Sequence, residues 1–519
     1  MMRNRLWVVF ALVLAWHAAI FIFTQQPVPA NDAFFYDGAV IHHLLHGGYY
    51  NPCVAPGFPI SGTEVFSAYP PLYQLPLLGW MSIFGVSALS AIAFHLCLFG
   101  LYALVMFAVF YRLRTPPWCV NTAAVLLLGI TFRDRPDSFA HVLGMLAVYA
   151  CVRSRKTLGR LPAEQAGVWV WLMAAFVVLA ITTSLQIGGI YLLVVSLATA
   201  MACHLDGEKL PIFPMSLMAL IPMALVLVVR LLLPRAWAGF MENVHQTPFL
   251  TGFRVPHWQE IAKVVRSVPG ILVVVILLPV VWFKRQRERD SEVARKHEVI
   301  LLAALLPALG ILVASLTIIS ANTVAISNYL QPLILAVYLA FSVSLWPGAR
   351  WLRLQMALLI PAMLLVSVRI VGMTTWGVMC ARDFGYTQAV QRTEAELANH
   401  PAGYKVVMSS AFLYTAAPDQ DLGLIHSDWM TRAGSDSRLS DLRGLRTLKP
   451  EKMILTQFDY YRRFEAVLQS LRGDPWLKGI QVTNTARVRP PDSFKSLRQV
   501  VQHISWAPVI VDLSWRDGD

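Results

Sequence analysis

Asp32 is the residue whose type and position in the sequence most strongly indicate chemistry. It follows the first apolar span and lies in the loop 24–87, which contains no Lys or Arg. A carboxylate at this place suggests a reaction at a membrane surface. Asp is also a favoured N-cap residue, so Asp32 has a second interpretation as the cap of the following helix, and the two roles are compatible. Asp37, about one helical turn later, is interpreted either as a supporting acid or as a solvated residue.

A second segment of interest begins at Tyr69 in the same loop. Its sequence is Tyr69-Pro70-Pro71-Leu72-Tyr73, and it continues as an apolar stretch that ends at Phe84. Because a transmembrane helix needs about 20 residues, this shorter stretch predicts an interfacial or buried re-entrant helix. Its aromatic residues are also of the kind that gathers at membrane interfaces.

A third segment, 133–138, lies at the outer mouth of the next predicted helical hairpin. Arg133 and Arg135 place two cations there, and Asp137 follows a proline at the predicted start of a helix. This position suits an N-cap, and it equally suits an acid that binds substrate or supports Asp32.

The composition predicts the class of protein that must position these residues. Of 519 residues, 56% are hydrophobic and 14% are charged, and the mean hydropathy is +0.56, which is typical of a polytopic membrane protein. The net charge of +13 does not indicate nucleic-acid binding, because the basic residues concentrate in short loops between apolar spans, where they set orientation. Nucleic acid is therefore excluded as a partner.

About eleven windows approach the length needed to cross roughly 30 Å of hydrocarbon. They are 6–23, 88–111, 117–132, 138–152, 168–183, 187–204, 214–233, 267–283, 299–320, 331–346 and 354–372. We expect the N-terminus to be cytoplasmic, because the basic clusters at 112–114, 153–160, 284–296 and 350–353 then lie inside. The first span is interpreted as a retained anchor. An odd number of spans places the residues after about 375 outside.

The last part of the chain changes character near Arg382, where charges of both signs become frequent and long apolar runs stop. We therefore expect two domains, a transmembrane domain over residues 1–375 and a small soluble α/β domain over 376–519. Within the second, predicted helices cover 384–399 and 459–471, and predicted strands cover 405–409, 452–456 and 509–513. The α/β domain has three alternative interpretations, which are acceptor binding, a lid and a purely structural role.

Taken together, the three outside segments resemble the GT-C glycosyltransferases, in the branch of the protein O-mannosyltransferases and the lipid A aminoarabinose transferase. Members have an Asp after the first helix, a Tyr four residues on, a Pro-Pro-Leu interfacial helix, and an Asp at a helix start in the second outside loop. Here these are Asp32, Tyr36, Pro70-Pro71-Leu72 and Asp137. The order and the membrane side agree over residues 1–152, and the later loops are compatible through about residue 372.

The resemblance implies an inverting enzyme that transfers a hexosyl or pentosyl group from a polyprenyl-phosphate donor to an extracytoplasmic lipid, glycan or protein. Asp32 would be the general base that removes the acceptor's proton, with Asp137 and Asp37 as supporting acids. Cations must stabilise the charge that develops on the leaving lipid phosphate. The candidates for binding the donor phosphate are Arg133, Arg135, Arg254, Lys263 and Tyr329, and the candidate substrate contacts are Tyr36, Tyr69 and Tyr73.

Two positions depart from the family pattern. Ala33 stands where an acid often follows the catalytic Asp, and Tyr69 stands where a Lys is common before Pro-Pro. The second change removes an expected phosphate contact. The resemblance therefore does not carry the aminoarabinose or O-mannosyl reaction itself over to this chain, whereas the role of Asp32 is retained.

Histidine spacing raises the question of a metal. His42 and His46 have the i,i+4 spacing that could place two imidazoles on a divalent metal, with Glu64 or His245 completing the site. The alternative is that these histidines only form the polar face of an interfacial helix. The sequence requires no cofactor.

The resulting hypothesis is an integral protein of a bacterial inner membrane whose partners are the bilayer, the lipid-linked donor and the acceptor. A transporter or flippase of lipid-linked sugars is the main alternative. It predicts functional charges near the bilayer midplane, where the apolar spans have almost none apart from Arg230 and Arg369 near span ends. A scaffold or inactive relative, whose C-terminal domain binds a partner, is a third.

Overall fold

The computed structural model describes most of the N-terminal half of the chain and much of the C-terminal part. The described residues are 2–24, 33–48, 71–113, 135–155, 163–232, 385–398, 400–401, 403–416, 423–426, 445–446, 449–460, 464–473, 475–484 and 507–516, with isolated positions between 120 and 128 and between 234 and 378. The predicted spans 267–283, 299–320, 331–346 and 354–372 lie outside the described residues, except for single positions, and 117–132 is described only in part.

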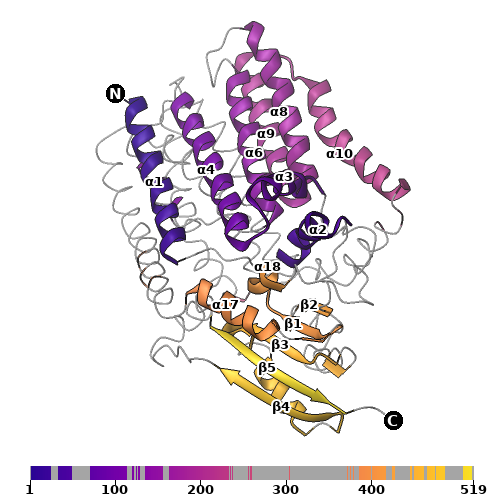
Figure 1. The fold of residues 1–519 in the computed structure, drawn as a ribbon. Coiled ribbons are helices and arrows are strands. Elements are labelled where there is room, and N and C mark those ends of the chain that lie inside the picture. Colours follow the sequence, from indigo (N-terminus) through magenta and orange to yellow (C-terminus); the bar gives the residue numbers. More distant parts are fainter. Residues whose placement is uncertain are drawn as a thin grey trace.

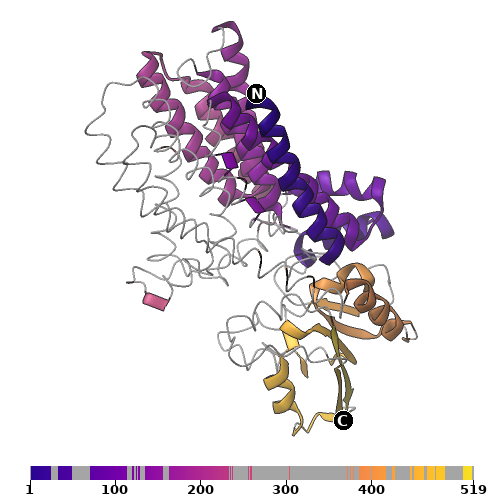
Figure 2. The same cartoon turned by 90° about the vertical axis from the view of Figure 1, so that its left-hand side faces the viewer.

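Among the described residues, six long helices pack into a bundle (Figures 1 and 2). They are α1 (Met2–Thr24), α4 (Ala88–Leu113), α6 (Pro136–Ser154), α8 (Ala163–Thr183), α9 (Leu185–Asp206) and α10 (Ile212–Leu232). Helix α6 packs against α4, α8 and α9, while α1 lies against α4 and α10 against α8. The sequence predicted each of these helices at nearly these positions. Within the described part, five of them, all except α6, are long and apolar enough to cross a membrane.

The outer surface of the bundle is apolar, which indicates that it faces lipid and not water. On α10, the side chains of Leu220, Met223 and Leu231 are 56%, 63% and 76% exposed. A contiguous apolar face of this kind would be unstable in water, whereas lipid chains solvate it. The chain is therefore an integral membrane protein.

The junction between α8 and α9 is a single residue, Ser184. Its hydroxyl oxygen accepts a hydrogen bond from the Ile187 amide at 3.5 Å, so it is the N-cap of α9. At the other end, Gly207 has a φ of 65°, a left-handed conformation that Gly adopts without strain, and its amide bonds to the Cys203 carbonyl. Capping hydrogen bonds thus define both ends of α9, one from a side chain and one from the backbone.

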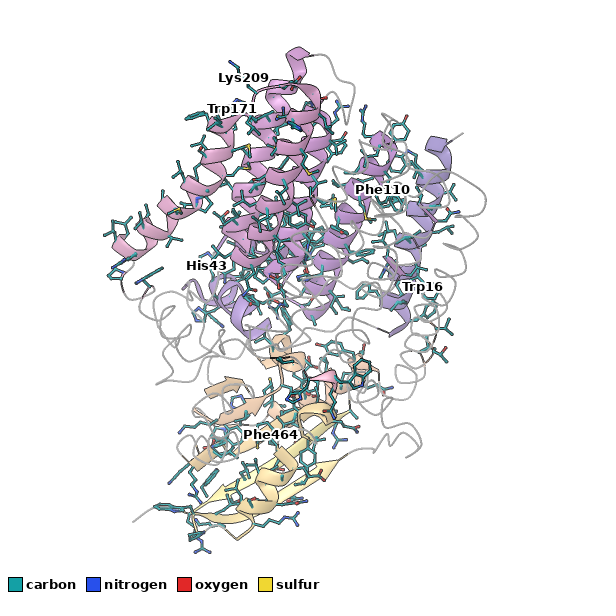
Figure 3. All side chains as sticks on the ribbon, turned by 180° about the vertical axis from the view of Figure 1, so that it is seen from behind. Trp16, His43, Phe110, Trp171, Lys209 and Phe464 are labelled. Atoms are coloured by element: carbon teal, nitrogen blue, oxygen red, sulfur yellow. The ribbon has the colours of Figure 1, made fainter. Side chains whose placement is uncertain are left out.

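Two shorter helices lie at one end of the bundle (Figure 1). They are α2 (Ala33–His46) and α3 (Gln74–Phe84), the latter preceded by the 3-10 turn η1 (Pro71–Tyr73). The apolar stretch before Gly85 is thus a short helix, as predicted. His43 of α2 lies at this end of the bundle, and Lys209, which follows α9, lies at the opposite end (Figure 3).

The C-terminal part contains a five-stranded mixed sheet in the order β2-β1-β3-β5-β4. Strand β1 pairs in parallel with β2 and β3, and β5 pairs antiparallel with β3 and β4. The elements are α17 (Tyr386–Leu397), β1 (Lys405–Met408), η2 (Ser410–Phe412), α18 (Leu413–Ala416), β2 (Gly423–His426), β3 (Lys452–Thr456), α20 (Gln457–Asp459), α21 (Glu465–Leu471), β4 (Leu477–Asn484) and β5 (Pro508–Trp515).

The sequence predicted part of this sheet. The strands 405–409, 452–456 and 509–513 and the helix 384–399 correspond to β1, β3, β5 and α17. The helix expected over 459–471 corresponds to α20 and α21, which begin at Gln457 and end at Leu471, while residues 461–463 lie outside the described residues. Strands β2 and β4 were not predicted. Apolar side chains of β3 and β5 pack against α21 around Phe464, which is fully buried (Figure 3).

Lys452 of β3 links the sheet to helix α17. Its Nζ donates to Glu396 of α17 at 2.8 Å and is 3.2 Å from the Asp512 carboxylate of β5. Burial by itself lowers the pKa of Lys452, but the hydrogen bonds and attraction of the two carboxylates outweigh burial and raise the pKa above its ordinary value of 10.5. The charged form of Lys452 therefore stabilises this part of the fold at neutral pH.

Candidate active site

The candidate base Asp32 lies outside the described residues, but the helix that follows it is described. Helix α2 begins at the next residue, Ala33. Five residues after Asp32, the Asp37 side chain is 0% exposed, so its interpretation as a solvated residue is wrong. The Tyr414 hydroxyl of α18 donates to Asp37 Oδ2 at 2.6 Å, and the Tyr73 hydroxyl is 3.5 Å from Oδ1. A buried acid therefore joins α2 to the C-terminal part of the chain.

Tyr73 connects Asp37 to a histidine inside α4. Its hydroxyl oxygen is 3.0 Å from His95 Nε2, while His95 Nδ1 is 2.8 Å from the Ala91 carbonyl. Because a carbonyl can only accept, Nδ1 carries the proton. In neutral His95, Nε2 is then the acceptor and Tyr73 donates to it, so the 3.5 Å contact to Asp37 is the weaker of the two.

The predicted substrate contacts Tyr36 and Tyr73 face the interior of the protein. They are 4% and 0% exposed, and their rings meet edge to face at a centroid distance of 6.2 Å. The Tyr36 carbonyl also accepts a hydrogen bond from the Gln74 side chain at 3.1 Å. These contacts hold α2 against η1 and α3, and the role of Tyr36 and Tyr73 in substrate binding remains a prediction. Tyr69 lies outside the described residues.

Asp137 is the centre of a second buried polar cluster. Its Oδ2 pairs with Arg135 Nε at 2.9 Å, and its Oδ1 accepts a hydrogen bond from the Ser184 hydroxyl at 2.8 Å. The N-cap position of α6 is occupied by Arg135, whose side chain forms no capping bond, so the interpretation of Asp137 as an N-cap is wrong. Asp137 instead lies in the first turn of α6, where the helix dipole favours a negative charge. It ties the start of α6 to the start of α9.

A deeper polar contact lies one turn further along α6. His141 Nδ1 is 3.2 Å from the Tyr191 hydroxyl of α9, and the His141 ring also meets Tyr102 of α4 edge to face. All three side chains are buried. Sequence reasoning missed His95, His141, Tyr102 and Tyr191, whereas it named Tyr73 as a substrate contact. The available signal was a histidine inside an apolar span, which is rare and frequently functional.

The predicted metal site remains a prediction. The rings of His42 and His46 lie 5.0 Å apart, and His42 Nδ1 is 2.7 Å from the Gly48 carbonyl. Glu64 and His245 lie outside the described residues. Within the described ranges, no group of three His, Cys, Asp or Glu side chains could hold a metal ion.

Of the residues predicted to bind phosphate, the structure describes only Arg135. Its side chain is 16% exposed, and its Nε is bound to Asp137. The remaining candidates, Arg133, Arg254, Lys263 and Tyr329, lie outside the described residues. Among these candidates, the structure therefore shows the surroundings of Arg135 only.

Comparison with solved structures relates the whole chain to one fold. No protein-family model matches the chain, and no curated protein matches it. ArnT from Cupriavidus metallidurans bound to undecaprenyl phosphate is 13% identical, with 97% of each chain covered and a TM-score of 0.56. The chain has the ArnT fold. ArnT in the apo state is 13% identical, again with 97% of each chain covered, at a TM-score of 0.51.

A third solved structure is the arabinofuranosyltransferase AftD from Mycobacteria. It is 15% identical and its TM-score is 0.45, and the match covers 100% of this chain but 42% of AftD. The predicted GT-C resemblance is confirmed at the level of the fold.

Proposed function

We propose that the chain is a membrane glycosyltransferase that moves a sugar from a polyprenyl-phosphate donor to an extracytoplasmic acceptor. The observation that carries this proposal is the ArnT fold over 97% of the chain, together with the undecaprenyl phosphate bound in one ArnT structure. The ordered motif around Asp32, Tyr36 and Pro70-Pro71-Leu72 supports the same function. The sugar is a hexose or pentose, and the acceptor is a lipid, a glycan or a protein.

In the proposed reaction, Asp32 is the general base. The acceptor's hydroxyl oxygen attacks the anomeric carbon, and the Asp32 carboxylate takes the proton that this oxygen loses. The bond between the anomeric carbon and the phosphate oxygen breaks, and the polyprenyl phosphate leaves with the electron pair. Attack from the face opposite the leaving group inverts the anomeric configuration.

Arg135 is proposed to stabilise the leaving phosphate. Its Nε is held by Asp137, which orients the guanidinium while the side chain retains some exposure. Such a guanidinium can donate in a bidentate manner to a phosphate. Arg133, Arg254, Lys263 and Tyr329 are proposed to act on the same group. Asp137 thereby acts on the reaction through Arg135, as a supporting acid.

The proposed topology has about eleven spans, a cytoplasmic N-terminus in a bacterial inner membrane, and residues 376–519 as an extracytoplasmic α/β domain. The N-terminus of α1 and the sheet lie at opposite ends of the bundle (Figure 1). Arg155, which follows α6, pairs with Glu208, which follows α9, at the end marked by Lys209 (Figure 3). Basic residues thus gather at the end remote from the sheet, in agreement with the positive-inside rule.

The experiment that tests this function measures transfer of radiolabelled sugar in membranes with matched expression of wild-type protein and Asp32→Asn. A panel of polyprenyl-phosphate sugars is combined with cell-envelope acceptors. We expect Asp32→Asn to lower transfer about 10²- to 10⁴-fold while binding of polyprenyl phosphate is retained. Asp206→Asn, at the far end of α9, is the matched control and should transfer normally. Equal transfer by wild type and Asp32→Asn would remove Asp32 from the mechanism.

A further inference from the structure

Tyr414 makes a buried contact between the C-terminal sheet and the helix that follows the candidate base. It lies in α18, which is reached from β1 through η2, and α18 packs against α2 (Figure 1). The Tyr414 hydroxyl is 2.6 Å from Asp37 Oδ2, and the two residues are 377 positions apart in the sequence. This bond joins two parts of the chain that lie far apart in the sequence.

The length of this bond indicates that it is a strong one. An O–H donor at about 2.5–2.7 Å from a carboxylate oxygen is typical of a charge-assisted hydrogen bond, which is roughly twice as strong as a neutral one. Asp37 is fully buried and Tyr414 is 7% exposed, so water does not compete effectively for either group. Breaking the bond would therefore loosen α2 at Asp37.

Other described contacts of α2 come from α3 and η1. Gln74 of α3 bonds to the Tyr36 carbonyl, and Tyr73 of η1 lies against Asp37 and Tyr36. Helix α2 is thus held by α3 and η1 in the transmembrane part as well as by α18 from the C-terminal part.

Tyr414 itself is anchored to the sheet. The Tyr386 hydroxyl of α17 donates to the Ala411 carbonyl of η2 at 2.8 Å. Ser409, between β1 and η2, donates through its amide to the Ile454 carbonyl of β3 and through its hydroxyl to Asp459. These bonds fix the backbone just before α18, so the Tyr414 hydroxyl is presented to α2 from the C-terminal end of β1.

We propose that Tyr414 is a positioning residue for the transfer reaction. By holding Asp37, it fixes α2, and because Asp32 immediately precedes the first residue of α2, it sets the position of the base. The C-terminal sheet thereby has a defined role, as the support that orients the catalytic end of α2 from outside the bundle. This inference rests on the proposed function, since it assigns the residue that positions the proposed base.

The test compares Tyr414→Phe with Thr393→Val in the full-length protein. Both substitutions remove one buried hydroxyl of the C-terminal part, but Tyr414 is bonded to Asp37 of α2, whereas Thr393 donates to the Ala389 carbonyl within α17. Displacement of a catalytic group by about 1 Å costs up to about 100-fold in rate. We therefore expect Tyr414→Phe to lower kcat about 10- to 100-fold with little change in the KM for the donor, and Thr393→Val to leave kcat near wild type.

A second readout does not depend on activity. Hydrogen exchange of the α2 amides around Asp37 should be faster in Tyr414→Phe and unchanged in Thr393→Val. Asp37→Asn should shift exchange in the same direction by a smaller amount, because its amide oxygen is a weaker acceptor than the carboxylate. In the double variant it should add little to Tyr414→Phe, because both changes act on one bond. Unchanged α2 exchange in Tyr414→Phe would overturn the positioning role, as would faster exchange with an unchanged kcat. Loss of the proposed function would appear separately, as absence of transfer by the wild type with every donor.

Discussion

Helices α8 and α9 approach each other closely at Gly188. We therefore predict that Gly188→Ala destabilises the protein. A Cβ at this position would lie 2.3 Å from both the Cα and the amide nitrogen of Ile181, and 2.5 Å from the carbonyl carbon of Ala180. All three are backbone atoms of α8, so no flexible side chain can move aside. The two helices would have to separate at the Ser184 junction, where the Gly188 amide bonds to the Ser184 carbonyl at 2.8 Å.

The expected change in the free energy of unfolding of Gly188→Ala follows from two opposing terms. Overpacking of a tight contact typically costs about 1–3 kcal/mol, and backbone contacts at this distance favour the upper end. Replacing Gly by Ala within a helix returns about 1 kcal/mol. We therefore expect Gly188→Ala to lower the free energy of unfolding by roughly 2 kcal/mol. At the neighbouring Gly189, nothing lies within 4 Å of an added Cβ, so Gly189→Ala should be neutral or stabilising by up to about 1 kcal/mol.

The assay is unfolding of both purified variants in the same detergent, followed by the signal of tertiary structure and compared with wild type. The predicted difference between the two neighbouring alanine variants is about 2–3 kcal/mol. A Gly188→Ala protein as stable as Gly189→Ala would refute the close packing at the α8–α9 junction and, with it, the position assigned to Ser184.

Three further outcomes are expected. Ser184→Ala should lower the free energy of unfolding by about 2–3 kcal/mol in the same detergent assay, because it leaves the buried Asp137 carboxylate short of a donor and removes a helix cap. Gly144→Ala should be destabilising, because its Cβ would lie 2.1 Å from the buried Tyr191 ring, and the loss should be smaller in a Tyr191→Leu background, as a double-mutant cycle would measure. Lys452→Met should destabilise the fold by roughly 1 kcal/mol at neutral pH. Because the pKa of Lys452 is raised above 10.5, its stabilising effect is fully present below that pH, and the difference from wild type should shrink only as pH rises beyond it.

The sequence predicts the bundle better than the site, for physical reasons. Each described span is a long apolar run, and hydrophobicity over about 20 residues is a local signal that needs no tertiary information. The sheet is predicted less completely. Strand β4 carries Lys478, Gln481 and Thr483 between its apolar residues and lies at an edge, so its apolar signal is weak. Strand β2 has four residues, too few for a clear period.

The contacts of the site depend on long-range geometry. Asp37 meets Tyr414 across 377 positions, and no local pattern pairs them. Asp137 looked like an N-cap because it follows a proline, but its partner Ser184 is 47 residues away and determines its role. The histidines within apolar spans were visible in the sequence, yet only the structure shows that His95 meets Tyr73.

The most direct test of the central claim is the fate of the donor in a reconstituted system. Purified protein in proteoliposomes is given a polyprenyl-phosphate sugar labelled in both the sugar and the lipid, with a cell-envelope acceptor. A glycosyltransferase predicts one free polyprenyl phosphate released for each sugar transferred. Intact donor that only changes its leaflet would contradict the account and support a flippase instead.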